Sequence, residues 1–278
     1  MKTDGSSQKR AGRAAKAAKK PGEKKGTGPA GHAGSAGPLL GEERMVDLLA
    51  GSPKEKQVER GVALIPGQQD MLKEMGHVGA GRSSGELSRL VGSIVRIAQP
   101  KVEFFSLVKP PERFIETDAD ELAAVFSRVS GETRGEIMAL LDRRSALALV
   151  DMLANRAMGT TADLSDDDDK RRVTELCADL CDRYLSAVGA LLALHLEKEE
   201  YKLVVTKSKA FATYLTMSIL GGEENSIFLK VCTEFSTTHV DASGKETPIS
   251  GSFVFLLQLD AVIGMLRVVK KRLETMSL

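Results

Sequence analysis

The most regular pattern of apolar and polar positions lies between residues 169 and 196. Apolar side chains recur there every three or four residues, at Leu176, Leu180, Tyr184, Val188 and Leu191. This spacing predicts a long helix that buries one face. A shorter pattern of the same kind predicts a helix over Ser145–Ala157, which ends at Gly159 because glycine readily adopts the backbone conformation that closes a helix.

Runs of β-prone residues flank these helices. Leu122–Val129 and Gly135–Leu141 are joined by a short glycine-containing stretch, which is typical of a β-hairpin. Further strands are expected at 94–97, 102–107, 202–206, 211–219, 227–235 and 252–257, and further helices from 66 or 67 to the low 80s, at 85–91 and at 260–276. These elements predict one α/β (α+β) domain over residues 61–278, with two long helices on one face of an antiparallel-rich sheet.

The order helix, strands, hairpin, helix occurs twice along the chain. This succession predicts an internal repeat whose second copy begins near Val173. Glu175 lies 101 residues after Glu74. We therefore expect these two glutamates to occupy corresponding positions of the two copies.

Charge is unevenly distributed along the chain. Residues 1–37 contain nine Lys and Arg against Asp4 and Glu23, a net charge of +7, which leaves −6 for the rest of a chain whose total is +1. This tail has almost no large apolar side chains, so we expect it to be disordered. The mild negative charge of the remainder argues against a specific nucleic-acid-binding domain.

Other sequence features restrict the protein's class and location. The chain contains no apolar run long enough for a membrane span, and its first residues lack the apolar core of a secretory signal. The cysteines suit a reducing compartment, which predicts a cytoplasmic protein. The four histidines are scattered without metal-ligand spacing, so no metal site is expected.

Candidate chemistry lies at the start of the first helix. Asp70, Glu74 and His77 are spaced i, i+4 and i+7, so their side chains project from one stripe. Gly79 and Gly81 leave the helix surface thin enough for another backbone to approach. Such an arrangement can hold and orient one water molecule. The alternative is a solvated helix start with ordinary polar residues.

The run from Leu72 to Phe104 resembles the CheC/CheX/FliY family of chemotaxis phosphatases. The family signature is Asp or Ser, three residues, Glu, two residues, Asn, twenty-two residues, Pro. Asp70, Glu74 and Pro100 stand at the matching positions, and His77 replaces the Asn. The resemblance extends over about residues 67–271 and implies a CheC-like domain with internal pseudo-twofold symmetry.

The resemblance also implies a reaction and a partner. In this family the first helix docks onto a phosphorylated CheY-type response regulator, whose aspartyl phosphate is hydrolysed. Glu74 would pair with a lysine of that partner, and His77 would orient the attacking water. The protein would need no cofactor of its own, because the partner supplies Mg²⁺. In the second copy only Glu175 remains of the signature, which implies a degenerate second site.

A short amphipathic segment precedes the domain, within residues 38–60. Its apolar side chains include Leu40, Met45, Leu48 and Leu49. The segment resembles the N-terminal peptide with which FliM and FliY capture phosphorylated CheY, although an N-terminal helix docked on its own domain has the same pattern.

Two functions follow from these observations. The first is a phosphatase that acts on phosphorylated CheY through Asp70, Glu74 and His77. The second is a non-catalytic adaptor with degenerate active sites, which binds phosphorylated CheY or the receptor deamidase CheD. The replacement of Asn by His77 favours the adaptor. The matching residues favour the enzyme; they are Asp70, Glu74, Gly79, Gly81 and Pro100.

Overall fold

A computed structural model describes residues 64, 66–106, 120–215, 217 and 227–276 of the chain. The basic tail predicted at 1–37 and the amphipathic peptide predicted within 38–60 lie outside the described residues. The helices are α2 (Pro66–Val91), α3 (Arg143–Leu153), α4 (Asp167–Leu192), α5 (Ser208–Tyr214) and α6 (Leu259–Met276). The strands are β1 (Arg96–Ile97), β2 (Lys101–Ser106), β3 (Glu121–Gly131), β4 (Gly135–Asp142), β5 (Leu196–Lys198), β6 (Lys202–Lys207), β7 (Ile227–Val240) and β8 (Glu246–Gln258).

The strands of the described residues form one antiparallel sheet, as predicted. β1 and β2 both pair with β7, and the order continues through β8, β4 and β3. On its other side β3 pairs with β5 and β6. The predicted hairpin is present, since β3 and β4 pair from Leu122 opposite Asp142 to Val129 opposite Gly135. The hydrophobic middle of the sheet is therefore built from β3, β4, β7 and β8.

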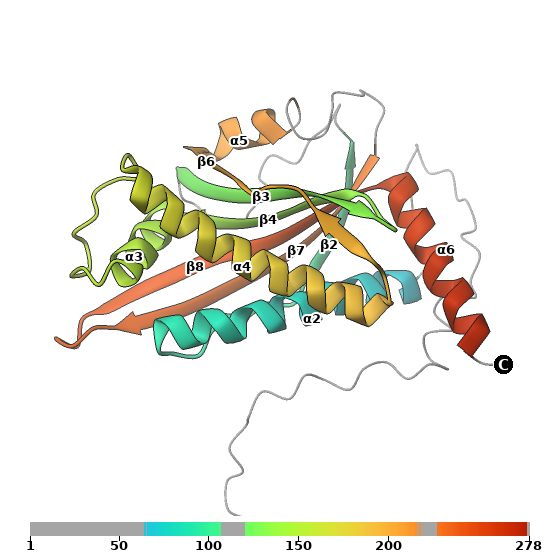
Figure 1. The fold of residues 1–278 in the computed structure, drawn as a ribbon, viewed down its shortest axis with the longest axis horizontal. Helices are drawn as coiled ribbons and strands as arrows, with labels where there is room; N and C mark the ends of the chain where they lie inside the picture. Colours follow the sequence, from blue (N-terminus) through green and yellow to red (C-terminus); the bar gives the residue numbers. More distant parts are fainter. Residues whose placement is uncertain (1–63, 65, 107–119, 216, 218–226, 277–278) are drawn as a thin grey trace, which may run out of the picture. The chain divides into compact units, whose positions relative to one another are not determined.

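The two long helices α2 and α4 lie side by side on one face of this sheet (Figure 1), which confirms the predicted architecture. Successive residues of a strand point to opposite faces, so each strand contributes to two cores. In β7, Leu229 and Val231 pack toward the long helices, whereas Phe228 packs on the other face with Phe211 of α5. None of the described helices is both long and apolar enough to cross a membrane.

The predicted repeat appears as a pseudo-twofold arrangement. Adding 101 to the residue numbers of α2 and β2 gives the first and last residues of α4 and β6. Each edge strand pairs with a long strand of the other copy, β2 with β7 and β6 with β3. The second copy thus begins at Asp167, slightly before the Val173 expected from sequence.

Two predicted elements were wrong in number or type, and others differ in their ends; α3, for example, ends at Leu153 and not at Ala157. One continuous helix, α2, replaces the two helices expected at 66 to the low 80s and at 85–91. The hydroxyl groups of Ser83 and Ser84 donate to the carbonyl oxygens of Gly79 and Gly81, and Ser83 also bonds to α4, so the glycine-rich stretch is held in the helix.

The second error concerns the strand expected at 211–219. Residues Ser208–Tyr214 form helix α5 instead. Phe211 and Leu215 are both fully buried, and their spacing of four places both side chains on one helical face above the sheet. Burial of this pair accounts for a helix where local β propensity favoured a strand.

Candidate functional site

The signature residues lie on the outer side of α2. Its inner side packs Met71, Leu72 and Met75 into the core, and each of these is almost fully buried. Asp70 and His77 are exposed, and Glu74 is half-buried between them. Because α2 is continuous through all three positions, the predicted stripe forms. We call Asp70, Glu74 and His77 the signature stripe.

The polar groups of the signature stripe have no bonding partner in the described part of the chain. Among the residues that the structure describes, no hydrogen bond or ion pair engages the side chains of Asp70, Glu74 or His77. Several other charged side chains of the two long helices are paired, as Arg89 is with Glu86 and Arg183 with Asp179. The stripe therefore presents two carboxylates and an imidazole that are available to a binding partner.

Pro100 lies beneath the helix that carries the stripe. A Cβ atom placed on Gly76 would lie 3.0 Å from Cβ of Pro100, 2.8 Å from Cγ1 of Val231 and 3.1 Å from Oγ1 of Thr233. Gly76 thus lets the backbone of α2 rest directly on Pro100 and β7, between Glu74 and His77. Pro100 itself is buried and immediately precedes edge strand β2.

Gly76 and Thr233 were not among the residues predicted from sequence. The position of Gly76 between Glu74 and His77 was a visible signal, since a glycine inside a helix usually marks a close approach. Thr233 gave no such signal. Its contact with Gly76 comes from a strand 157 residues away along the chain.

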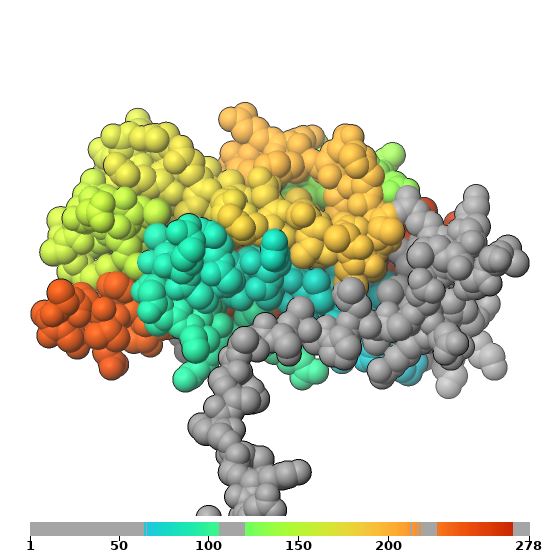
Figure 2. Space-filling view, turned by 60° about the horizontal axis from the view of Figure 1, so that its bottom comes forward, coloured from blue at the N-terminus to red at the C-terminus, as the bar shows by residue number. Residues whose placement is uncertain are grey.

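The two glycines that were predicted to thin the helix have different surroundings. Gly81 faces open space, with no atom within 4 Å of a Cβ placed on it. Gly79 faces inward, where a Cβ would lie 2.7 Å from the ring of Tyr184 in α4. Gly81 alone therefore thins the outer surface, and Gly79 permits the close packing of α2 on α4. Figure 2 shows these two helices as adjacent ridges on one surface of the domain.

Comparison with known proteins bears on the fold. No family model matches the sequence. The crystal structure of Thermotoga maritima FliY matches with a TM-score of 0.56 at 16% identity, over 75% of this chain and 98% of the FliY chain. The chain has the FliY fold. Two further matches are the Helicobacter pylori FliM middle domain (TM-score 0.46, 13% identity, 73% and 99% coverage) and a CheX–CheY–BeF3–Mg complex from Borrelia burgdorferi (0.40, 14%, 65% and 96%).

The second half of this FliY fold does not repeat the signature stripe. Glu175 of α4 matches Glu74, but Arg171 lies at 3.4 Å from its carboxylate and also binds Asp168 at 2.8 Å. Ala178, which has no hydrogen-bonding side chain, stands where α2 has His77. Tyr201 stands where the first copy has Pro100, and its hydroxyl donates to Asp182 at 2.8 Å. These replacements remove the polar group of the His77 position from the second copy.

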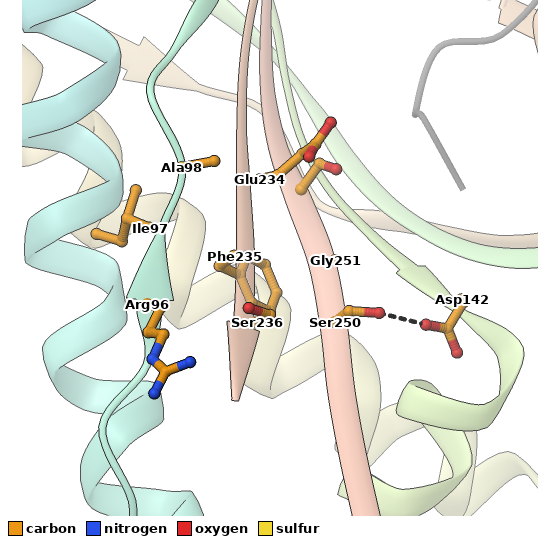
Figure 3. Close-up of a pocket in the computed structure, with 10 residues that line it drawn as sticks. Arg96, Ile97, Ala98, Asp142, Glu234, Phe235, Ser236, Ser250 and Gly251 are labelled. Carbon is orange, nitrogen blue, oxygen red and sulfur yellow. Dashed lines mark hydrogen bonds between the residues drawn. The ribbon is translucent and has the colours of Figure 1, made fainter. Parts of the chain in front are cut away.

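The FliY-like domain also has a hollow of about 340 Å³ beside strands β1, β7 and β8, lined on the sheet face opposite the long helices by Glu234, Ser236 and Ser250 (Figure 3). Of its two acidic residues, Asp142 and Glu234, Asp142 caps α3 by accepting from Ser145 and also accepts from the Ser250 hydroxyl at 2.7 Å. The residues that line this hollow do not include Asp70, Glu74 or His77, so the hollow is separate from the signature stripe.

Cysteine chemistry is not suggested by the fold. Cys177, Cys181 and Cys232 are buried, and burial raises the pKa of the Cys177 thiol to about 12. A thiol in that state is not a nucleophile at neutral pH. Among the described residues, no three His, Cys, Asp or Glu side chains are grouped as metal ligands.

Proposed function

We propose that this protein binds the phosphorylated form of a CheY-type response regulator and hydrolyses its aspartyl phosphate at the signature stripe. The observation that supports this proposal is the placement of Asp70, Glu74 and His77 on one continuous, outward-facing helix. Buried Pro100 beneath Gly76 supports that helix at the level of the stripe. The FliY fold and the spaced signature residues are consistent with a role in chemotaxis signalling.

Docking and catalysis fall to different residues in this proposal. The Glu74 carboxylate pairs with a lysine ammonium of the response regulator, while Asp70 extends the acidic part of the surface. A neutral His77 ring accepts a hydrogen bond from a water molecule through its unprotonated nitrogen and orients that water toward phosphorus. The protein supplies no metal, because Mg²⁺ bound to the partner stabilises the charge on the phosphoryl group.

The reaction is a hydrolysis of an acyl phosphate. The oxygen of the water forms a bond to phosphorus, and the bond between phosphorus and the aspartate carboxyl oxygen breaks. The electron pair of that bond leaves with the aspartate, which becomes a carboxylate. The proton lost by the water passes to His77 and then to solvent, and inorganic phosphate is released.

Phosphate release from phosphorylated CheY tests this proposal directly. We expect Glu74→Ala and His77→Ala to reduce turnover on the order of 100-fold, because loss of docking or of water positioning has effects of that size. Glu175→Ala is the matched control, since this exposed glutamate lies at the equivalent position of α4. Full turnover in His77→Ala would refute a catalytic role for the imidazole.

The adaptor is the second candidate function, and His77 is the observation that favours it. An imidazole is bulkier than a carboxamide and places its polar atoms differently, so the substitution can abolish water positioning while Glu74 still docks. An adaptor would bind beryllofluoride-activated CheY, or CheD, without hydrolysing phosphorylated CheY. His77→Asn would then produce turnover that the native protein lacks.

A further inference from the structure

The signature stripe carries negative charge, as does the phosphoryl group on which it is proposed to act. Asp70 and Glu74 are both carboxylates, and a phosphorylated aspartate brings a dianion toward the same surface. When two groups of the same charge come into contact and part of the water between them is lost, the free energy of binding becomes less favourable. A cation on this surface would add to the partner's Mg²⁺ in offsetting that charge, and the one Lys or Arg between Pro66 and Gly81 is Lys73.

Lys73 lies on the correct part of α2. It follows Asp70 by three residues and precedes His77 by four, so it is a surface neighbour of both. Its side chain is half-buried, which fits a lysine whose apolar stem lies along the helix while its ammonium group reaches solvent. Among the described residues, no carboxylate forms an ion pair with it, in contrast to Arg89 and Arg183.

Arg82 provides an internal comparison. It is also exposed, and the described residues include no ion-pair partner for it. It lies five residues after His77, however, which at 100° per residue places it about 140° around the helix from that side chain. The two cations thus share a helix and a charge but differ in direction.

We propose that Lys73 binds the phosphoryl oxygens of the partner's aspartyl phosphate and makes the site selective for the phosphorylated state. This inference rests on the proposed function. A lysine ammonium is a compact charge with three donors. It can bind phosphate oxygens from several directions and does not need the paired geometry of an arginine. In this arrangement Glu74 recognises the response regulator, His77 positions the water, and Lys73 recognises the modification.

The test compares Lys73→Gln, Lys73→Arg and Arg82→Gln in the full-length protein. The readouts are kcat and KM for phosphorylated CheY, together with Kd for unmodified CheY and for CheY activated with beryllofluoride and Mg²⁺. We expect Lys73→Gln to raise KM and the Kd for activated CheY about 10-fold, with the Kd for unmodified CheY unchanged. Lys73→Arg retains most of the affinity, and Arg82→Gln stays within about twofold of the native protein.

The results separate the two proposals. Native-like KM and Kd values in Lys73→Gln would overturn the role of Lys73 while the phosphatase or adaptor function stands. Equal losses for activated and unmodified CheY would also overturn it, because they would show a general docking residue. If the native protein neither binds nor hydrolyses phosphorylated CheY, the proposed function fails, and the role of Lys73 fails with it.

Discussion

In the proposed function, one side chain distinguishes an enzyme from an adaptor. At position 77 an imidazole occupies the place where the family signature has a carboxamide, one turn of helix beyond Glu74. The two groups differ in size and in the direction of their acceptor atoms, and a displacement of about 1 Å at a reacting atom can cost on the order of 10²-fold in rate. Residue chemistry at one position therefore separates the phosphatase from the adaptor.

Glu136 shows another consequence of residue chemistry, away from the signature stripe. Its carboxyl group is almost fully buried in β4, with Arg128 at 3.3 Å. Burial raises the pKa of Glu136 to about 7, against the hydrogen bond and charge of Arg128, which lower it, while Glu199 adds a repulsive charge. The folded protein therefore binds this proton more tightly than the unfolded chain.

Glu136 should make the protein less stable as pH rises. Its stabilising contribution is complete below pH 4.5, the ordinary value, and is lost as pH rises through about 7. We expect Glu136→Gln to raise the free energy of unfolding at pH 8 by roughly 1–3 kcal/mol and to have little effect at pH 4.5. Urea unfolding at both pH values measures this, with exposed Glu246→Gln as the control. Destabilisation by Glu136→Gln that is larger at pH 8 than at pH 4.5 would show that pairing of the ionised carboxylate with Arg128 outweighs burial.

Between elements, the closest packing in the helical layer is that of α2 on α4. The ring of Tyr184 packs directly against Gly79, and the hydroxyl of Ser83 donates a hydrogen bond to the carbonyl oxygen of Leu180 at 2.7 Å. The shift of 101 residues exchanges these two contacts, since Gly79 corresponds to Leu180 and Ser83 to Tyr184. The pseudo-twofold axis therefore passes between the helices at this point, which fixes how α2 presents its outer face.

Substitutions of the two glycines should have opposite effects. Gly79→Ala would bring a Cβ to 2.7 Å from the Tyr184 ring and should lower the free energy of unfolding by about 1–3 kcal/mol. Gly81→Ala meets no atom within 4 Å and should raise it by about 0.5–1 kcal/mol, because alanine favours helix. Chemical denaturation of both variants measures the pair. Equal effects of the two changes would contradict the packing described for Gly79.

For the whole described domain, the two copies of the repeat are interleaved. Edge strand β2 pairs with β7, β6 pairs with β3, and β4 pairs with β8, so each copy depends on backbone hydrogen bonds from the other. Neither copy has a complete sheet by itself. The domain is therefore one cooperative unit, although its sequence contains two similar halves.

This interleaving predicts the behaviour of fragments. A fragment of residues 64–165 should remain unfolded, because its edge strand lacks β7 and its helix α2 lacks α4. Expressed together with residues 166–278, it should recover the far-ultraviolet circular dichroism and the protected amides of the intact domain. The intact chain should unfold in one transition. A dispersed amide spectrum from 64–165 alone would show that the first half folds independently.

Local pattern was enough to predict the hairpin of β3 and β4, the long helix α4 and the signature stripe. Hydrophobic periodicity specifies which face of an element is buried, and a spacing of four and three residues specifies one face of a helix. The strand expected at 211–219 was wrong because the decisive contact, Phe211 on the second face of the sheet, is not local. The continuity of α2 through its glycines depends in the same way on α4.

The sequence by itself determined the β3–β4 hairpin, the long helix α4, the antiparallel class of the sheet, the repeat and the alignment of Asp70, Glu74 and His77. Only the tertiary structure decided that Gly79 serves packing on Tyr184 while Gly81 remains open, and that Gly76 rests on Pro100 and Thr233. The physical reason is the distance along the chain between the residues that interact. Periodicity records how each residue is oriented on its own element, whereas the role of a glycine or a buried proline depends on atoms brought beside it from distant parts of the chain.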